Sequence, residues 1–271
     1  MNTRISLLLS ILLSIASLNT FAAPIDRLME RSGLNAQIDQ FPAQIEMGMT
    51  QSSNDGDLTA DELAQLKRLT RHVFTAESLR NDIKQHLNDS MDKSTIEEAL
   101  VWLDSPLGKK ITALESAAST PDAFAQMQQQ AGDLSRRADR VNAVLRFDQA
   151  TGATDAAIGM STNVAIAITL PMVMRLPAEQ QPDVGTLVSL ISKETEKQRQ
   201  NYEPLVLMSF LYTYQSLTDE ELEQYISFAA SAPGQAYHAT TFEALNHAFI
   251  NHGKKLGELF SDSLQVAQQN I

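Results

Sequence analysis

The sequence predicts an all-α fold made of two related helical-bundle halves that arose by internal duplication. Helix-capping patterns precede several apolar runs with helical spacing. No stretch alternates apolar and polar residues in the manner of a strand. In addition, one short motif returns later in the chain, which is the sequence signature of a repeated structural unit.

The N-terminal residues predict export. Arg4 precedes an apolar stretch over 5–18, and Ala22 completes a small-x-small pattern of the kind that signal peptidase cleaves. We therefore expect residues 1–22 to be a signal peptide. The chain has no cysteine, so a lipid anchor at the cleavage site and disulfides within the chain are both excluded.

Composition and charge limit the partners. Of the 271 residues, 43% are hydrophobic, which is enough for one large core or two modest ones. The formal net charge is −12, and such an acidic protein is poorly suited to nucleic acid or to anionic lipid surfaces. We therefore expect a soluble protein with no nucleic-acid partner.

Capping patterns predict where several helices begin. Thr59, Ser94 and Thr218 each stand three residues before a glutamate, and Thr120 is followed by a proline that suits a first helical turn. Apolar residues then recur by threes and fours over 124–145. This seam favours a helix packed in a bundle, and an intermolecular coiled coil is the alternative.

A long uncharged segment lies in the middle of the chain. Residues 156–174 contain no charged side chain, but Ser161, Asn163 and Pro171 interrupt the segment. We predict a buried central helix, with a membrane span as the alternative. The protein without its signal peptide is accordingly expected not to be an integral membrane protein.

The repeated motif is an aromatic residue, a serine and a glycine spaced by threes. Each residue of the second copy follows its counterpart by 126 positions (228 − 102, 231 − 105 and 234 − 108). The two copies are Trp102, Ser105 and Gly108 in the first and Phe228, Ser231 and Gly234 in the second.

A second pair of landmarks supports the same division. The segments 27–33 and 146–152 both begin with arginine and an apolar residue and both end with a hydroxyl residue and glycine. Each predicts a short helix that is ended by a glycine in the left-handed conformation. The predicted halves are 23–142 and 143–271.

The motif has the composition of a sharp joint between two helices. Ser105 can cap the following helix, Pro106 suits its first position, and a glycine in its first turn leaves room for a neighbouring element. The aromatic residue would pack beneath the corner. We take the six motif residues as candidate binding residues. The alternative is an anion site in which the first-turn amides act with Lys109 and Lys110.

The first copy resembles a known bacterial family. Its aromatic-Ser-Pro-x-Gly sequence follows an amphipathic helix rich in glutamate, including Glu97 and Glu98. This combination is similar to the exported family called domain of unknown function 2059. The resemblance covers 97–115 and, more loosely, 218–245, where the proline is displaced to Pro233. It implies two tandem copies, the second divergent, in a helical protein of the Gram-negative periplasm, and it supplies no catalytic residues.

No sequence motif for catalysis or for cofactor binding is present. The chain has no Gly-x-Ser-x-Gly, phosphate-loop, dinucleotide or His-Glu-x-x-His sequence, and we expect no cofactor. The favoured function is a non-enzymatic binding or interaction module, in which a groove between the halves holds an unidentified protein, peptide or lipid. The alternative is a metal-binding protein or hydrolase with a site around Glu243 and His247, which are four positions apart on a predicted helix.

Overall fold

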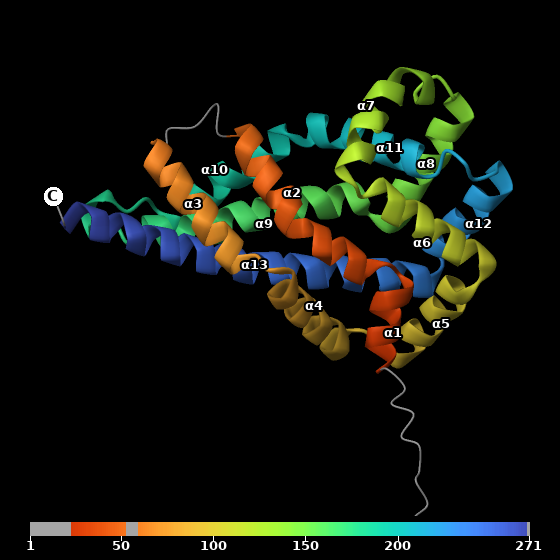
Figure 1. Ribbon diagram of the computed structural model, residues 1–271, viewed down its shortest axis with the longest axis horizontal. Coiled ribbons are helices and arrows are strands. Elements are labelled where there is room, and N and C mark those ends of the chain that lie inside the picture. Colours follow the sequence, from red (N-terminus) through yellow and green to blue (C-terminus); the bar gives the residue numbers. More distant parts are fainter. Residues whose placement is uncertain (1–22, 53–58, 270–271) are drawn as a thin grey trace, which may run out of the picture.

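The computed structural model describes residues 23–52 and 59–269, and within these ranges the chain forms helices and no strand (Figure 1). The predicted all-α class is confirmed, while the predicted signal peptide lies outside the described residues. A 3-10 helix, η1 (Ala178–Gln180), precedes α10. The α-helices are α1 (Pro24–Arg31), α2 (Leu34–Ser52), α3 (Ala60–Val73), α4 (Ala76–Ser90), α5 (Lys93–Asp104), α6 (Pro106–Ala118), α7 (Pro121–Leu134), α8 (Ala138–Thr151), α9 (Ala153–Val173), α10 (Val184–Lys197), α11 (Arg199–Thr213), α12 (Asp219–Ala230) and α13 (Ala232–Gln269).

Two series of helices pack in a corresponding way. In the first series α1 contacts α2, α4 and α5, and α2 contacts α3 and α4. In the second series α8 contacts α9, α11 and α12, and α9 contacts α10 and α11. Helix α7 connects the two series. The boundary predicted between 142 and 143 falls within α8.

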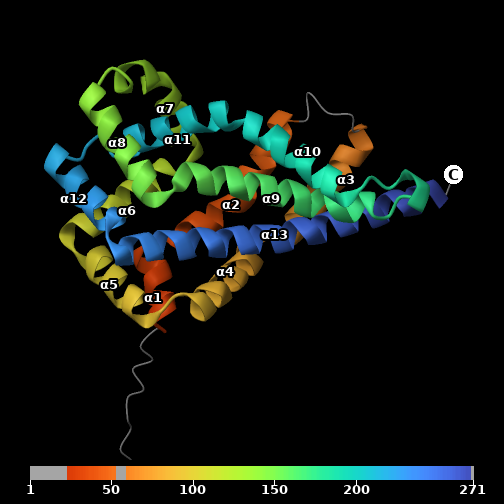
Figure 2. The same cartoon turned by 180° about the vertical axis from the view of Figure 1, so that it is seen from behind.

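The last helix of each series packs against the opposite series. Helix α6 contacts α11 of the second series. In the same way, α13 contacts α4, which holds the place in the first series that α11 holds in the second. Helix α13 also runs beside α9 for most of the length of the molecule, as both views show (Figures 1 and 2). The two series are therefore interlocked and do not form two separate bundles.

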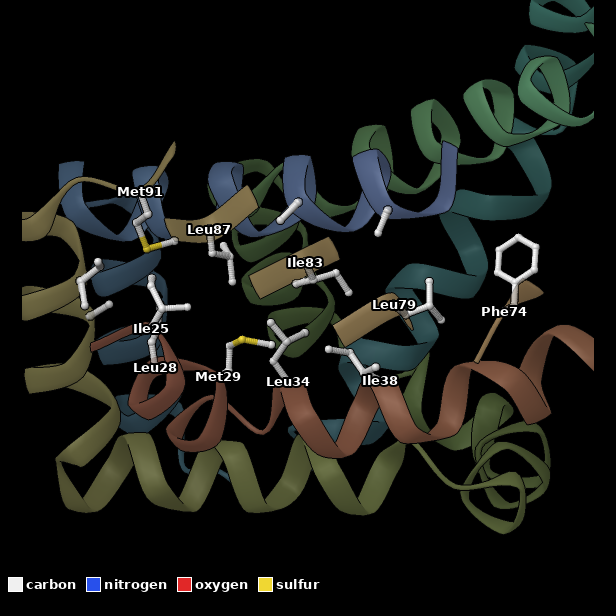
Figure 3. Packing of buried hydrophobic residues seen from close by; sticks show 14 of the residues in the cluster. Ile25, Leu28, Met29, Leu34, Ile38, Phe74, Leu79, Ile83, Leu87 and Met91 are labelled. Carbon is white, nitrogen blue, oxygen red and sulfur yellow. The ribbon is translucent and has the colours of Figure 1, made fainter. Parts of the chain in front are cut away.

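Side chains from α1, α2 and α4, together with residues of α3, α5 and α13, form the first hydrophobic core (Figure 3). Apolar residues recur at helical spacing in each of these helices, and the buried side chains turn toward one another. Each fully buried leucine or isoleucine contributes about 1.5–3 kcal/mol to folding. The labelled residues of this core are Ile25, Leu28, Met29, Leu34, Ile38, Phe74, Leu79, Ile83, Leu87 and Met91.

The second core is formed by α6, α8, α11 and α12 together with the loop between α11 and α12. It is rich in aromatic residues, among them Phe147, Tyr214 and Tyr225, which contact one another. Trp102, on α5, packs against this core and against the first one. The aromatic residue of the first motif thus lies where the two cores meet.

Most predicted helix ends are confirmed. Thr59 and Thr218 form complete capping boxes, and Thr120 caps α7. The capping box predicted at Ser94 is wrong, because Asp92 caps α5 instead: its carboxylate accepts from the amide of Thr95 and from the hydroxyl of Ser94. An aspartate two residues earlier was available as the better acceptor.

The landmark glycines behave as predicted, whereas the long seam does not form one helix. Gly33 and Gly152 both adopt positive φ, at 72° and 68°. In contrast, the seam over 124–145 is divided, because α7 ends at Leu134 and α8 starts at Ala138. The apolar spacing continues across a tight turn, and apolar periodicity by itself does not register such a break.

The uncharged central segment forms α9, but it is not a buried helix. Most of its side chains are half-buried, and among them only Thr154 and Ile158 are fully buried, so the prediction of a buried helix is wrong. By length and hydropathy, α9 is the one helix among the described residues that could cross a membrane. Along one side it lies against α13, and the two backbones approach closely at Gly257, where a Cβ atom would lie 2.2 Å from the carbonyl oxygen of Ile168.

Replacing Gly257 with alanine is expected to lower the free energy of unfolding by about 2–3 kcal/mol, because α9 and α13 would have to separate. Gly159→Ala is the matched control on α9, since a Cβ atom there would meet no atom within 4 Å. This control should stabilise the protein by about 0.5–1 kcal/mol through helix propensity. Urea denaturation of both variants measures the difference. Equal effects would show that the contact between α9 and α13 is not tight.

Candidate functional site

The first motif is a sharp corner between α5 and α6. Ser105 ends α5 and caps α6: its hydroxyl accepts a hydrogen bond from the amide of Gly108 at 2.9 Å. Pro106 occupies the first position of α6, where its missing amide leaves no hydrogen bond unmade. The predicted helix–helix joint is confirmed at this position.

The second motif forms a corner with nearly the same backbone geometry. Ser231 has φ −70° and ψ 157°, against −66° and 158° for Ser105. Its hydroxyl accepts from the amide of Gly234 at 3.2 Å. The displacement of proline by one position therefore does not alter the joint between α12 and α13.

Both corners require glycine for close packing of backbone on backbone. A Cβ atom on Gly108 would lie 2.2 Å from the carbonyl oxygen of Trp102, and one on Gly234 would lie 1.9 Å from that of Phe228. These separations are far below van der Waals contact. The glycines allow each second helix to start directly against the last turn of the first.

The aromatic residues of the two motifs stack on each other. The rings of Trp102 and Phe228 are parallel within 6°, and their centroids lie 4.6 Å apart. The ring of Tyr225 stacks on Trp102 at 5.8 Å. Each aromatic residue was predicted to anchor its own corner, but the structure brings the two corners together through this stack. Helices α5, α6 and α12 thus gather at the end of the molecule away from the C-terminus (Figures 1 and 2).

A cavity of about 390 Å³ opens beside the stack. Residues of α2, α5, α6, α8, α9, α11, α12 and α13 line it, so both helical series contribute to its wall. The wall contains eight aromatic residues and several aliphatic ones, along with serine and threonine hydroxyls, one carboxamide, one carboxyl group and one imidazole. The aromatic residues that line it are Trp102, Phe147, Phe210, Tyr214, Tyr225, Phe228, Tyr237 and Phe242.

Glu115 carries the carboxyl group in the cavity wall. Its Oε1 accepts hydrogen bonds from the hydroxyls of Tyr214 at 2.8 Å and Tyr225 at 2.9 Å. Burial raises the pKa of Glu115 above its usual range, although both tyrosine hydrogen bonds oppose that shift. Burial, and then the charge of Glu115, raise the pKa of Tyr214 and of Tyr225, so both hydroxyls stay protonated donors at neutral pH.

His238 places an imidazole in the same wall. Its Nε2 atom is buried and has no hydrogen-bond partner. Burial lowers the pKa of His238 to about 4, so the ring is uncharged at neutral pH. An unpartnered buried nitrogen is uncommon in proteins.

Three of the six predicted site residues line the cavity, and three support it. Trp102, Gly108 and Phe228 lie in the wall. Ser105, Ser231 and Gly234 do not, and their role is to form the two corners. No sequence motif pointed to Glu115, Tyr214, Tyr225 and His238, because each stands alone in the sequence and only packing brings them together. The single signal for Glu115 was an acidic residue among the apolar positions of α6.

The alternative anion site at the first corner is not supported. The amide of Gly108 is already bonded to Ser105. The ammonium group of Lys110 contacts both carboxylate oxygens of Glu221 at 2.7 Å. The Gly108 amide and the Lys110 ammonium group are therefore already bonded within the protein.

The predicted metal pair lies away from this cavity. Glu243 and His247 are exposed on α13, and the imidazole of His247 packs on that of His86 with centroids 4.9 Å apart. Among the described residues no group of three or more histidine, cysteine or acidic side chains could hold a metal ion. The arrangement of the described side chains therefore does not support a metal site at Glu243 and His247.

Comparison with known proteins gives one match. Residues 77–137, which run from α4 through α7, match a family described as "Uncharacterized protein conserved in bacteria (DUF2059)". The matched segment contains the first corner and Glu115, whereas the stretch 218–245 lies outside it. No curated protein and no solved structure gives a significant match to the chain.

Proposed function

We propose that this protein is an exported, non-enzymatic binding protein that holds a small organic molecule in the cavity between its two helical series. The observation that carries the proposal is the cavity itself, whose wall combines eight aromatic residues with the carboxyl group of Glu115 and the imidazole of His238. Ligand pockets typically have volumes of about 300–1,000 Å³ and apolar walls with a few polar groups. A volume of about 390 Å³ suits a small molecule better than a folded partner.

The two series also support a proposed origin by internal duplication. Helices α1 to α6 correspond in order to α8 to α13, the contacts among α1 to α5 recur among α8 to α12, and the two corners share their backbone angles. The stacked pair Trp102 and Phe228 consists of equivalent motif positions, as expected for residues beside the axis of a two-fold arrangement. A boundary in the turn before α8 keeps that helix whole, and we place it there.

Export to the periplasm remains a proposal that rests on the N-terminal sequence and on the family resemblance. Helix α1 begins at Pro24, two residues after the predicted cleavage site. N-terminal sequencing of protein recovered from a periplasmic fraction should begin at Ala23. Recovery of the full-length chain from the cytoplasm alone would contradict the proposal.

Binding can be followed with the protein's own fluorescence. Trp102 is the single tryptophan of the chain and lines the cavity. We expect the neutral probe 2-phenylethanol to change the Trp102 emission in a saturable manner. Ala118→Phe should weaken that binding at least tenfold, because Ala118 lines the cavity and a phenyl ring there would fill it.

Ala117→Phe is the matched control for this experiment. Ala117 precedes Ala118 on the same helix, but its side chain is exposed and does not line the cavity. This variant should bind the probe as the wild type does. Equal binding by all three proteins would place the probe elsewhere and contradict the proposed cavity site, and the absence of binding to the wild type would do the same.

A further inference from the structure

We infer that the ligand is a small organic cation, namely an alkylammonium group on an aromatic or apolar body, and that Glu115 and the surrounding aromatic rings recognise it. This inference rests on the proposed function and adds the chemical class of the ligand. Three features of the cavity carry it: a carboxylate oxygen without a protein donor, the absence of a basic partner, and walls of aromatic rings.

The carboxyl group of Glu115 is only half satisfied. Both tyrosine hydroxyls donate to Oε1, and among the described residues no group donates to Oε2. Oε2 nevertheless keeps some accessible surface. This oxygen therefore faces space that a ligand can enter, and a ligand N–H group would complete its hydrogen bonding.

No side chain of the described part of the protein neutralises this carboxyl group. Glu115 takes part in none of the ion pairs, and none of the residues lining the cavity is lysine or arginine. The titratable groups that line the cavity with it are Tyr214, Tyr225, Tyr237 and His238. Burial raises the pKa of each tyrosine and lowers that of His238, so all four are uncharged at neutral pH. A positive partner would stabilise the ionised form of this partly buried carboxyl group, and none of the residues lining the cavity supplies one.

The aromatic wall favours the same kind of ligand. The faces of tryptophan, tyrosine and phenylalanine rings carry a negative quadrupole that attracts cations, most strongly where water is excluded. The same rings offer apolar contact to the body of the ligand. An anion would instead meet the carboxylate and the ring faces, both of which repel it. The imidazole of His238 also lines the cavity, and because burial lowers its pKa to about 4 it adds no positive charge at neutral pH.

The affinity of the cavity for a cation should depend on pH. Burial raises the pKa of Glu115, and a bound cation would favour its ionised form. Cation binding should therefore release a proton from Glu115, and affinity should rise with pH up to neutrality. A neutral ligand of the same shape should show no such rise.

The experiment compares phenethylamine, which is cationic at neutral pH, with 2-phenylethanol, its uncharged counterpart. Binding is measured by Trp102 emission and by calorimetry on the full chain without its signal peptide. We expect phenethylamine to bind at least tenfold more tightly at pH 7.5 and to lose this advantage toward pH 4. Glu115→Gln should abolish the preference for the amine and keep the binding of the alcohol. Glu98→Gln, an exposed site on α5, should keep both.

Folding of the Glu115→Gln variant can be checked independently. The amide oxygen of glutamine can still accept from Tyr214 and Tyr225. Because the folded-state pKa of Glu115 is raised, the wild type loses stability as pH rises through that pKa. The variant should therefore be more stable than the wild type at neutral pH and no more stable at acid pH.

The outcomes separate the two proposals. If 2-phenylethanol binds in the cavity and phenethylamine binds no better, or if Glu115→Gln leaves the amine preference intact, the cation inference is overturned while the binding function stands. If neither probe binds the wild type, both proposals fail.

Discussion

Replacing Gly108 with alanine is expected to destabilise the protein by about 3 kcal/mol or more, because the added methyl group has no space to occupy. Its Cβ atom would lie 2.2 Å from the carbonyl oxygen of Trp102 and 2.9 Å from the Cα atom of Leu103. Both are backbone atoms, so no side-chain rotation can relieve the overlap. The corner between α5 and α6 would have to open, and the indole ring of Trp102 would leave its stack with Phe228. Denaturant unfolding together with the Trp102 emission of the folded state measures both effects.

Gly234→Ala tests the second corner in the same way. There the Cβ atom would lie 1.9 Å from the carbonyl oxygen of Phe228, so we expect a destabilisation of similar size. Gly132→Ala is the control: Gly132 is exposed on α7, with no atom within 4 Å of the added carbon. This control should stabilise the protein by about 0.5–1 kcal/mol through helix propensity. Tolerance of alanine at either corner would mean that the helices meet less closely there than the structure indicates.

Local signals in the sequence were sufficient to predict most helix starts and the joints between helices. Each capping residue acts on amides within three positions of itself, so Thr59, Ser105 and Thr218 could be recognised without knowledge of the fold. The cap predicted at Ser94 was wrong because Asp92 lies two residues earlier. A carboxylate is a stronger acceptor than a hydroxyl, so Asp92 caps the helix. Left-handed glycines were predicted for the same local reason.

Long-range packing was beyond such signals. The stack of Trp102 on Phe228 joins residues 126 positions apart, and the duplicated motif marked both without indicating that they touch. Glu115 meets Tyr214 and Tyr225 only because α6 packs against the opposite helical series. The half-buried position of α9 was mispredicted for a related reason, since its apolar composition is equally compatible with a fully buried helix.

The cavity lies where the interlocked helices meet, and this placement connects fold and proposed function. Helix α6 brings Glu115 to the second series, and α13 brings His238 to the end of the same space. A buried carboxyl group and an unpartnered imidazole nitrogen both cost folding free energy. The presence of the Glu115 carboxyl group in the cavity wall favours a role in binding over a role in stability.

Replacing Arg140 with alanine is expected to have the largest effect on stability of any single charged residue. Its side chain is only 3% exposed and holds the loop between α11 and α12. The guanidinium group donates to the backbone carbonyls of Tyr214 and Leu217 and to the carboxylate of Asp219 at 2.7 Å. Alanine would leave two carbonyl groups without their donor, so we expect a loss of about 3–5 kcal/mol in the free energy of unfolding.

Two further variants test whether geometry or charge explains this loss. Arg140→Lys keeps the charge but lacks the planar fork, so it should recover only part of the stability. Arg146→Ala is the matched control on the same helix: Arg146 pairs with Glu223, but both side chains are more than half exposed. That control should cost no more than about 1 kcal/mol. Because the loop held by Arg140 positions Tyr214 against Glu115, Arg140→Ala should also weaken probe binding in the cavity, whereas Arg146→Ala should not. Equal effects of the two alanine variants on stability and binding would show that the loop is held by other contacts.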